Sequence, residues 1–344
     1  MERLYLMPSE VARLRGAFLP VVVAAAVWSV PSQATDDGFK LNGAVRLRYE
    51  AIDGQARVGF NRNDALRNTR TNIMAQYRTG TVLFAVEIYD SRIRGDDAGT
   101  PVTTAEVIAI EPVQAYVAAD ILAPLGKGTK LTVTADRMML NLGSRRLVAA
   151  DDYRNTTNGY TGVRADLVAP QGIRATVLYT LPQMRLPDDP QALRNAKIRL
   201  DRESFDLVLW GGIISKANMF GTAMGELSYF HLGERDAPGR ATRGQSIDTF
   251  GGRVIAEPRT GKVDYEVEAF YQTGHVSASM AATAARQTVS ASFAHADIGY
   301  SFAGDWKPRL SIDLDRASGD KTGGDNGRFD TFDRTYCPNP RQRS

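Results

Sequence analysis

The feature that most constrains this chain is a period-two alternation of apolar and polar side chains that recurs along its length. The stretch 39–51, FKLNGAVRLRYEA, sets apolar residues such as Val45 against charged residues such as Arg46 and Arg48. Successive side chains of a β-strand point to opposite faces, so this pattern predicts a strand with one apolar and one charged face. A strand of a soluble sandwich shows the same alternation, so a single segment does not decide the architecture.

The alternation is repeated often enough to describe most of the chain. We predict about 13 strands, which cover residues 39–51, 69–78, 82–91, 113–121, 130–136, 163–167, 173–180, 205–214, 222–231, 250–256, 263–273, 291–302 and 308–315. No helix is predicted after the N-terminal segment. Strand-period segments of roughly ten residues, separated by turn residues, are typical of an all-β transmembrane antiparallel barrel.

The connections alternate in length, which is a second and independent indication of a barrel. Short connections cover residues 79–81, 169–172, 216–221, 257–262 and 303–307, and the intermediate connection 122–128 falls in a short position. Long connections cover residues 52–66, 92–111, 137–158, 181–202, 233–246 and 274–287. Bacterial barrels have short periplasmic turns and long external loops. A secreted structural or adhesive β protein has no reason to keep this order.

The N-terminus has the pattern of a signal peptide. Arg13 and Arg15 precede an apolar run of about 12 residues, which is short of the roughly 20 that span a bilayer as a helix. The following Pro31–Ala34 fits cleavage after Ala34; an N-terminal anchor helix is the alternative. We therefore predict a signal peptide over residues 1–34, a barrel over 35–331, and export to the outer membrane of a Gram-negative bacterium.

The C-terminal residues break the alternation. Counted from a periplasmic N-terminus, the last predicted strand ends on the external side, whereas single-chain bacterial barrels have an even number of strands. We predict an incomplete C-terminus with an aberrant, non-barrel tail over residues 332–344; a strand count wrong by one is the alternative. Cys337 is the single cysteine, so the chain has no internal disulfide.

Signals for an enzyme are weak. The histidines His231, His275 and His295 are far apart in the sequence and have no carboxylate partners at motif spacing. A G-x-S-x-G elbow is absent, and no Ser/His pair is evident for a lipase-like barrel. We expect no enzymatic activity and no cofactor.

A metal site is not predicted either. Asp313, Asp315 and Asp320 are close in the sequence, but their spacing is not that of a calcium loop. We expect Asp313 and Asp315 to be lumen-facing strand positions and Asp320 to lie in a loop.

Arginines are the one group of residues that points to a binding function, because their planar guanidinium groups pair with carboxylates and stay charged. The candidate pore and substrate-binding residues, on polar strand faces or adjoining loops, are Arg46, Arg48, Arg70, Arg137, Arg145, Arg146, Arg154, Arg164, Arg174 and Arg253, and Arg78 and Arg92 share the pattern. Interleaved acids are Glu50, Glu87, Asp136, Asp166, Glu226, Glu266 and Glu268. For any single arginine a salt bridge that braces the wall is the simpler interpretation. The set, concentrated in the N-terminal half, predicts a cation-rich lumen that selects anions.

The connection within residues 140–163 concentrates these charges. Arg145 and Arg146 are adjacent, and Asp151 and Asp152 precede Arg154. We predict that the three arginines lie at or near the pore mouth or constriction, partly paired with the two aspartates. The formal net charge is only +3, so the composition gives no sign of a nucleic-acid partner.

Several segments resemble the alginate export family of outer-membrane proteins. The resemblance runs from about residue 38 to about residue 331, and the segments that carry it are 45–50, 65–70, 87–92, 113–116, 136–137, 142–148, 153–156, 313–320 and 328–330. It implies a monomeric barrel of 18 strands that passes the polyuronate alginate through an electropositive, arginine-lined constriction.

These features favour a passive outer-membrane porin for an anionic polysaccharide or oligosaccharide of the alginate type. Lumen arginines would attract its carboxylates, and the interleaved acids would keep binding weak enough for release. The partners expected are the saccharide, outer-membrane lipid and a periplasmic export complex. The alternative is a general porin for small anionic solutes.

Overall fold

The computed structural model describes residues 37–54, 61–97, 99–100, 102–150, 153–238, 240–320 and 327–332. The predicted signal peptide and the predicted tail beyond residue 332 lie outside these residues. Asp151 and Asp152, the predicted partners of the loop arginines, also lie outside them.

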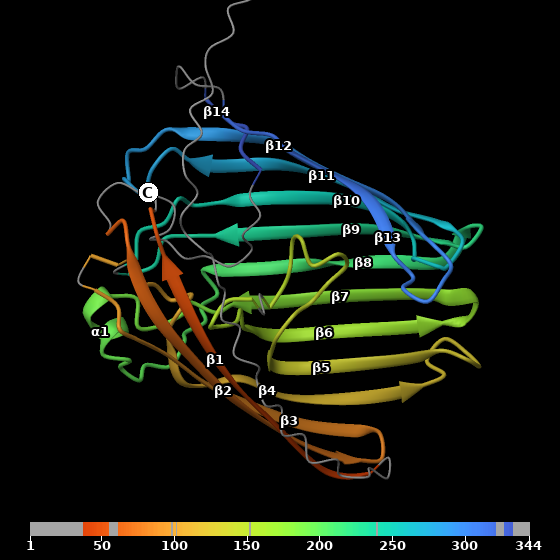
Figure 1. The fold of residues 1–344 in the computed structure, drawn as a ribbon, viewed down its shortest axis with the longest axis horizontal. Coiled ribbons are helices and arrows are strands. Elements are labelled where there is room, and N and C mark those ends of the chain that lie inside the picture. The colour runs from red at the N-terminus through yellow and green to blue at the C-terminus, as the bar shows by residue number, and fades with distance from the viewer. Residues whose placement is uncertain are drawn as a thin grey trace, which may run out of the picture.

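The chain folds into one antiparallel sheet in which each long strand pairs with its neighbours in sequence (Figure 1). The strands are β1 (Gly38–Ile52), β2 (Asp64–Thr79), β3 (Val82–Arg94), β4 (Ile108–Leu122), β5 (Lys130–Met138), β6 (Tyr160–Ala169), β7 (Ile173–Pro182), β8 (Leu207–Phe220), β9 (Ala223–Glu234), β10 (Ser246–Ala256), β11 (Val263–Ser277), β12 (Arg286–Ser301) and β13 (Arg309–Ala317). A two-residue strand, β14 (Arg328–Phe329), pairs in parallel with β12. The all-β antiparallel prediction is confirmed.

Each predicted strand is present, and several are longer than predicted. β2 begins at Asp64, which pairs with Ile52, and β12 begins at Arg286, which pairs with Ser277. Backbone hydrogen bonds extend these strands through residues without clear alternation, so the side-chain pattern underestimated their length. The predicted alternation of short and long connections is confirmed, from the tight β2–β3 turn to the long connection between β5 and β6.

The expectation of no helix was wrong at two short places. Helix α1 (Pro190–Arg194) lies in the β7–β8 connection, and a 3₁₀ turn, η1 (Pro170–Gly172), joins β6 to β7. α1 begins where the side chain of Asp189 accepts a hydrogen bond of 2.8 Å from the backbone N–H of Ala192. A helix of one turn is too short to give a periodic pattern in the sequence. Among the described residues, no helix has the length and apolar character to cross a membrane.

The sheet curls, so that β1–β3 run obliquely to the stacked strands β5–β12 (Figure 1). Its outer face exposes large apolar side chains, including Val45, Ile73 and Val267. Its inner face carries buried polar side chains such as Glu268 and Gln272, which are 2% and 1% exposed. Within the described residues, β1 and β13 are the two edges of the sheet and do not pair with each other.

We expect the apolar outer face to contact lipid, which a pair of matched substitutions on β11 can test. Val267 lies inside the strand and Val263 at its turn end, and both side chains are more than half exposed. Replacing Val267 with arginine should destabilise the folded protein in a bilayer by about 2–4 kcal/mol, and Val263→Arg by about 0–1 kcal/mol. Urea unfolding in lipid vesicles measures both changes. Equal effects of the two substitutions would contradict a lipid-facing band.

Candidate functional site

In the connection between β5 and β6, residues 139–150 and 153–159 fold back over the inner face of the sheet, and we name them the inner loop. In Figure 1 it is the yellow-green trace in front of β6, β7 and β8. Its buried apolar residues pack against inner-face residues of several strands; the core they share includes Leu140, Leu142, Leu147, Val148, Leu178, Leu209, Phe230, Phe270 and Phe293. Burial of each large apolar side chain is worth roughly 1.5–3 kcal/mol, so this contact holds the loop inside the curl of the sheet.

A tight turn directs the tip of the inner loop toward β9. The backbone N–H of Arg145 donates to the carbonyl of Leu142 at 2.9 Å, and Gly143 within this turn has a φ of 54°. A side chain at Gly143 would place its Cβ 2.8 Å from the carboxylate of Glu226. Glycine is favoured here by the left-handed backbone, and a Cβ would also require the flexible carboxylate of Glu226 to shift.

Next to this turn, Ser144 and Arg146 of the inner loop contact acidic residues of β11. Arg146 Nη1 lies 2.6 Å from Glu266 Oε1 and 2.8 Å from Glu268 Oε2, and Ser144 donates to Glu268 at 2.7 Å. Burial of the Arg146 guanidinium opposes its charge, but the hydrogen bonds to the two glutamates outweigh burial and raise the pKa of Arg146. Arg253 Nε also contacts Glu266, at 3.0 Å. Arg146 thus tethers the loop to the wall.

A second part of the inner loop is held by three arginines of β1 and β2, Arg46, Arg48 and Arg70, which we name the arginine anchor. Arg48 donates to the carbonyl of Tyr153 at 2.8 Å. Arg46 and Arg70 both donate to the carbonyl of Arg154, the latter at 3.3 Å. Three predicted site residues from two strands therefore converge on one short stretch of the loop, together with Arg154 itself.

Asn155 completes this anchorage and is 1% exposed. Its side-chain amide donates to the carbonyls of Thr69 and Glu106 at 3.0 and 2.8 Å, and its side-chain oxygen accepts from Arg46 at 3.3 Å. Ser91 Oγ donates to its backbone carbonyl at 2.5 Å. The side chain and backbone carbonyl of Asn155 thus tie the loop to β1, β2, β3 and the β3–β4 connection.

The remaining candidates are spread over the sheet and adjoining loops. Arg137 contacts Glu111 at 2.5 Å and Glu203 at 3.1 Å, and its side chain is 14% exposed. Arg164 pairs with Asp166 at 2.7 Å on the same strand. These two arginines, like Arg253, have the contacts of residues that brace the wall.

Three further arginines are more open. Arg145 lies exposed at the turn of the inner loop, and Arg174 is exposed near the short-turn end of β7. Arg154 packs its guanidinium over the ring of Tyr153, 5.7 Å from the centroid. Arg92 differs from the expectation: it pairs with Asp90 at 2.8 Å on the outer face of β3, opposite to the face that buries Tyr89 and Ser91.

The inner face is richer in arginine on its β1–β2 side, where Glu50 pairs with Arg48, and richer in acids on its β9–β13 side, where Arg253 and Arg309 pair with some of them. Basic residues of β1 and β2 are Arg46, Arg48, Arg70 and Arg78. Acids of β9 and β11–β13, which we name the acidic wall, are Glu226, Asp264, Glu266, Glu268, Asp297, Asp313 and Asp315. The inner loop joins the two sides, because its Arg146 contacts the acidic wall and its residues 153–155 contact the arginine anchor.

The structure also shows contacts that sequence spacing missed. His231 Nδ1 lies 2.8 Å from Asp248 on the neighbouring strand, and His295 Nδ1 lies 2.8 Å from Asp315. Because each partner comes from an adjacent strand, no fixed sequence spacing marks the pair. Arg154-Asn155-Thr156 belonged to the stretch that resembled a known family, but nothing in the residues alone indicated that Asn155 is the buried anchor.

A curled antiparallel sheet with an apolar outer face, a charged inner face and an inward-folded loop has the architecture of the outer-membrane β-barrel class. Residues 39–343 match the family described as Alginate export, and the chain belongs to this family. A search of curated proteins found no match.

Asn155→Ala should release the inner loop from its anchor. It removes the four hydrogen bonds of a buried side-chain amide, so we expect roughly 2–4 kcal/mol of destabilisation. Urea unfolding and limited proteolysis within residues 139–159 measure the change. The matched control is Asn42→Ala, because Asn42 is exposed on β1. Equal protease resistance of the two variants would contradict the anchoring role.

Asp201 in the β7–β8 connection should make stability pH-dependent. Burial, and then the charge of Glu111, raise the pKa of Asp201 to about 7. A raised folded pKa favours the neutral carboxyl, so its stabilising contribution is present below about pH 4 and is lost as pH rises through about 7. Asp201→Asn keeps an oxygen that can accept a hydrogen bond from the N–H of Leu186. Because the amide does not titrate, we expect this variant to lose roughly 1–4 kcal/mol of the change in unfolding free energy between pH 4 and 8. Identical profiles of unfolding free energy from pH 4 to 8 would contradict the assignment.

Proposed function

We propose that this protein is an outer-membrane channel for an anionic polysaccharide or oligosaccharide of the polyuronate type, and that the inner loop constricts its pore. The observation that carries this proposal is the convergence of Arg46, Arg48 and Arg70 on the backbone carbonyls of Tyr153 and Arg154 in the inner loop. Membership of the alginate export family supports an export channel in the outer membrane. The predicted signal peptide, residues 1–34, would direct the chain there.

The uneven distribution of charge suggests how an anionic chain would pass. Carboxylates of the saccharide are attracted by the arginine anchor and repelled by the acidic wall, so the path follows the β1–β2 side of the constriction. Arginine suits this role because its planar group can hold one carbonyl and still present further N–H donors to a passing carboxylate. Repulsion from the opposite wall keeps each contact weak enough for the next carboxylate to replace it.

Transport of this kind needs no catalytic group and no cofactor. The saccharide moves through the channel by diffusion or is driven by a periplasmic export complex that acts as a partner. The working unit is a monomer, since the constriction is built from strands and a loop of one chain. The acidic saccharide is the substrate, and lipid surrounds the apolar outer face.

Single-channel recording in planar bilayers tests the proposal. We expect the protein to conduct with anion selectivity and polyuronate to block the current. The double substitution Arg46→Gln and Arg70→Gln should lower anion selectivity and weaken the block by roughly tenfold, because both guanidiniums leave the constriction. Arg92→Gln is the control, since Arg92 lies on the outer face. Cation selectivity, or an equal loss in the control, would contradict the proposal.

Saccharide length separates the two candidate substrates. A polyuronate channel should be blocked by long chains at lower carboxylate concentration than by single uronates, because several carboxylates bind at once. A general porin for small anions should respond equally to both at matched carboxylate concentration. Deleting residues 142–149 should raise conductance by roughly two- to fivefold in either case, because it widens the constriction.

A further inference from the structure

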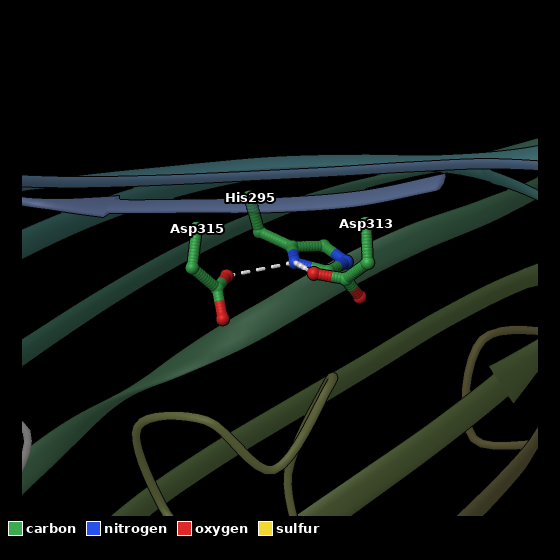
Figure 2. A group of neighbouring side chains, drawn as sticks. All are labelled: His295, Asp313 and Asp315. Carbon is green, nitrogen blue, oxygen red and sulfur yellow. Dashed lines mark hydrogen bonds and ion pairs between the residues drawn. The ribbon is translucent and has the colours of Figure 1, made fainter. Parts of the chain in front are cut away.

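The edge of the acidic wall holds a cluster of one histidine, His295, and two aspartates, Asp313 and Asp315. His295 lies on β12, and Asp313 and Asp315 lie two residues apart on the adjacent strand β13 (Figure 2). His295 Nδ1 is 2.8 Å from Asp315 Oδ1 and 3.8 Å from Asp313 Oδ1. One donor atom from each residue lies within 4.8 Å of the others. We propose that His295, Asp313 and Asp315 bind a first-row divalent transition-metal ion of the Zn²⁺ type.

The charge around the cluster favours a cation. Neighbouring acids of the wall already have arginine partners: Arg309 contacts Asp264 and Asp297, and Arg146 contacts Glu266 and Glu268. For Asp313 and Asp315, the only basic group within ion-pair distance in the described part of the chain is His295. Two carboxylates therefore share one imidazole.

The hydrogen bonding of the imidazole points the same way. His295 is 3% exposed, and the carboxylates of Asp313 and Asp315 both approach its Nδ1. A ring nitrogen carries at most one hydrogen, so it cannot donate well to two carboxylates in different directions. A cation placed between the three atoms would be attracted by all of them.

The donor set selects the class of metal. One imidazole nitrogen and two carboxylate oxygens suit Zn²⁺ and its neighbours, whereas Ca²⁺ and Mg²⁺ take oxygen ligands. Bonds of about 2.0–2.2 Å place the donors of a Zn²⁺ site roughly 3.3 Å apart. The side chains of Asp313 and Asp315 are 61% and 52% exposed. The Asp315 side chain can therefore move away from His295 Nδ1, which lengthens their 2.8 Å contact and makes room for the ion. Their exposure also leaves room for water as a further ligand.

Calorimetric titration of the full-length, detergent-folded protein with ZnCl₂ tests this inference. We expect one Zn²⁺ per chain, with binding weakened at least about tenfold by His295→Gln or Asp315→Asn. Excess Ca²⁺ should not displace the ion. Co²⁺ as a second probe should give the visible absorption bands of a low-symmetry nitrogen–oxygen site, and His295→Gln should abolish them.

His231→Gln is the matched control, because His231 also lies 2.8 Å from an aspartate on the next strand but has one carboxylate there instead of two. It should leave the affinity unchanged. Asp313→Asn alters an exposed side chain and serves if the buried histidine variant does not fold. The inference is overturned if no Zn²⁺ binds, if Ca²⁺ displaces it, if the control weakens binding as much as His295→Gln, or if Asp313→Asn and Asp315→Asn leave binding unchanged. None of these outcomes depends on whether the protein conducts anions.

Discussion

The strands of this sheet must satisfy two environments at once, and the rest of the structure depends on this constraint. Backbone N–H and C=O groups are paired along the sheet, so side chains alone decide what each face contacts. On β11, Val263 and Val267 point outward while Glu266 and Glu268 point inward. The inner face therefore carries charge in a partly enclosed space, where each ion must find a partner.

The inner loop supplies partners for many of the charged side chains of the inner face. Its Arg146 neutralises part of the acidic wall, and its backbone carbonyls accept hydrogen bonds from the arginine anchor. Leucine and valine side chains between these ends add apolar contact with the wall. A loop held in this way at both ends is a structural brace and, in the proposed channel, the constriction. The same contacts serve both roles, because a constriction must keep its shape against a moving polymer.

The arginines divide into groups that sequence patterns do not separate. Arg137, Arg164 and Arg253 have the wall-bracing contacts that were the simpler interpretation for any single arginine. Arg46, Arg48 and Arg70 converge instead on the loop. Arg92 lies on the outer face, because the strand continues past the segment in which its alternation was clear. Arg46, Arg48 and Arg70 have partners 84 to 108 residues away in the sequence, so no local pattern distinguishes them from the bracing arginines.

The sequence by itself determined the strands, their neighbours and the order of short and long connections, because a period of two and turn residues are local properties. It also indicated a connection in which charges cluster, at Arg145, Arg146 and Arg154. Only the tertiary structure decided that this connection folds inward, that Asn155 anchors it, and that His295 meets Asp313 and Asp315. These contacts join residues far apart in the chain, so they depend on how the sheet curls and on the register between neighbouring strands.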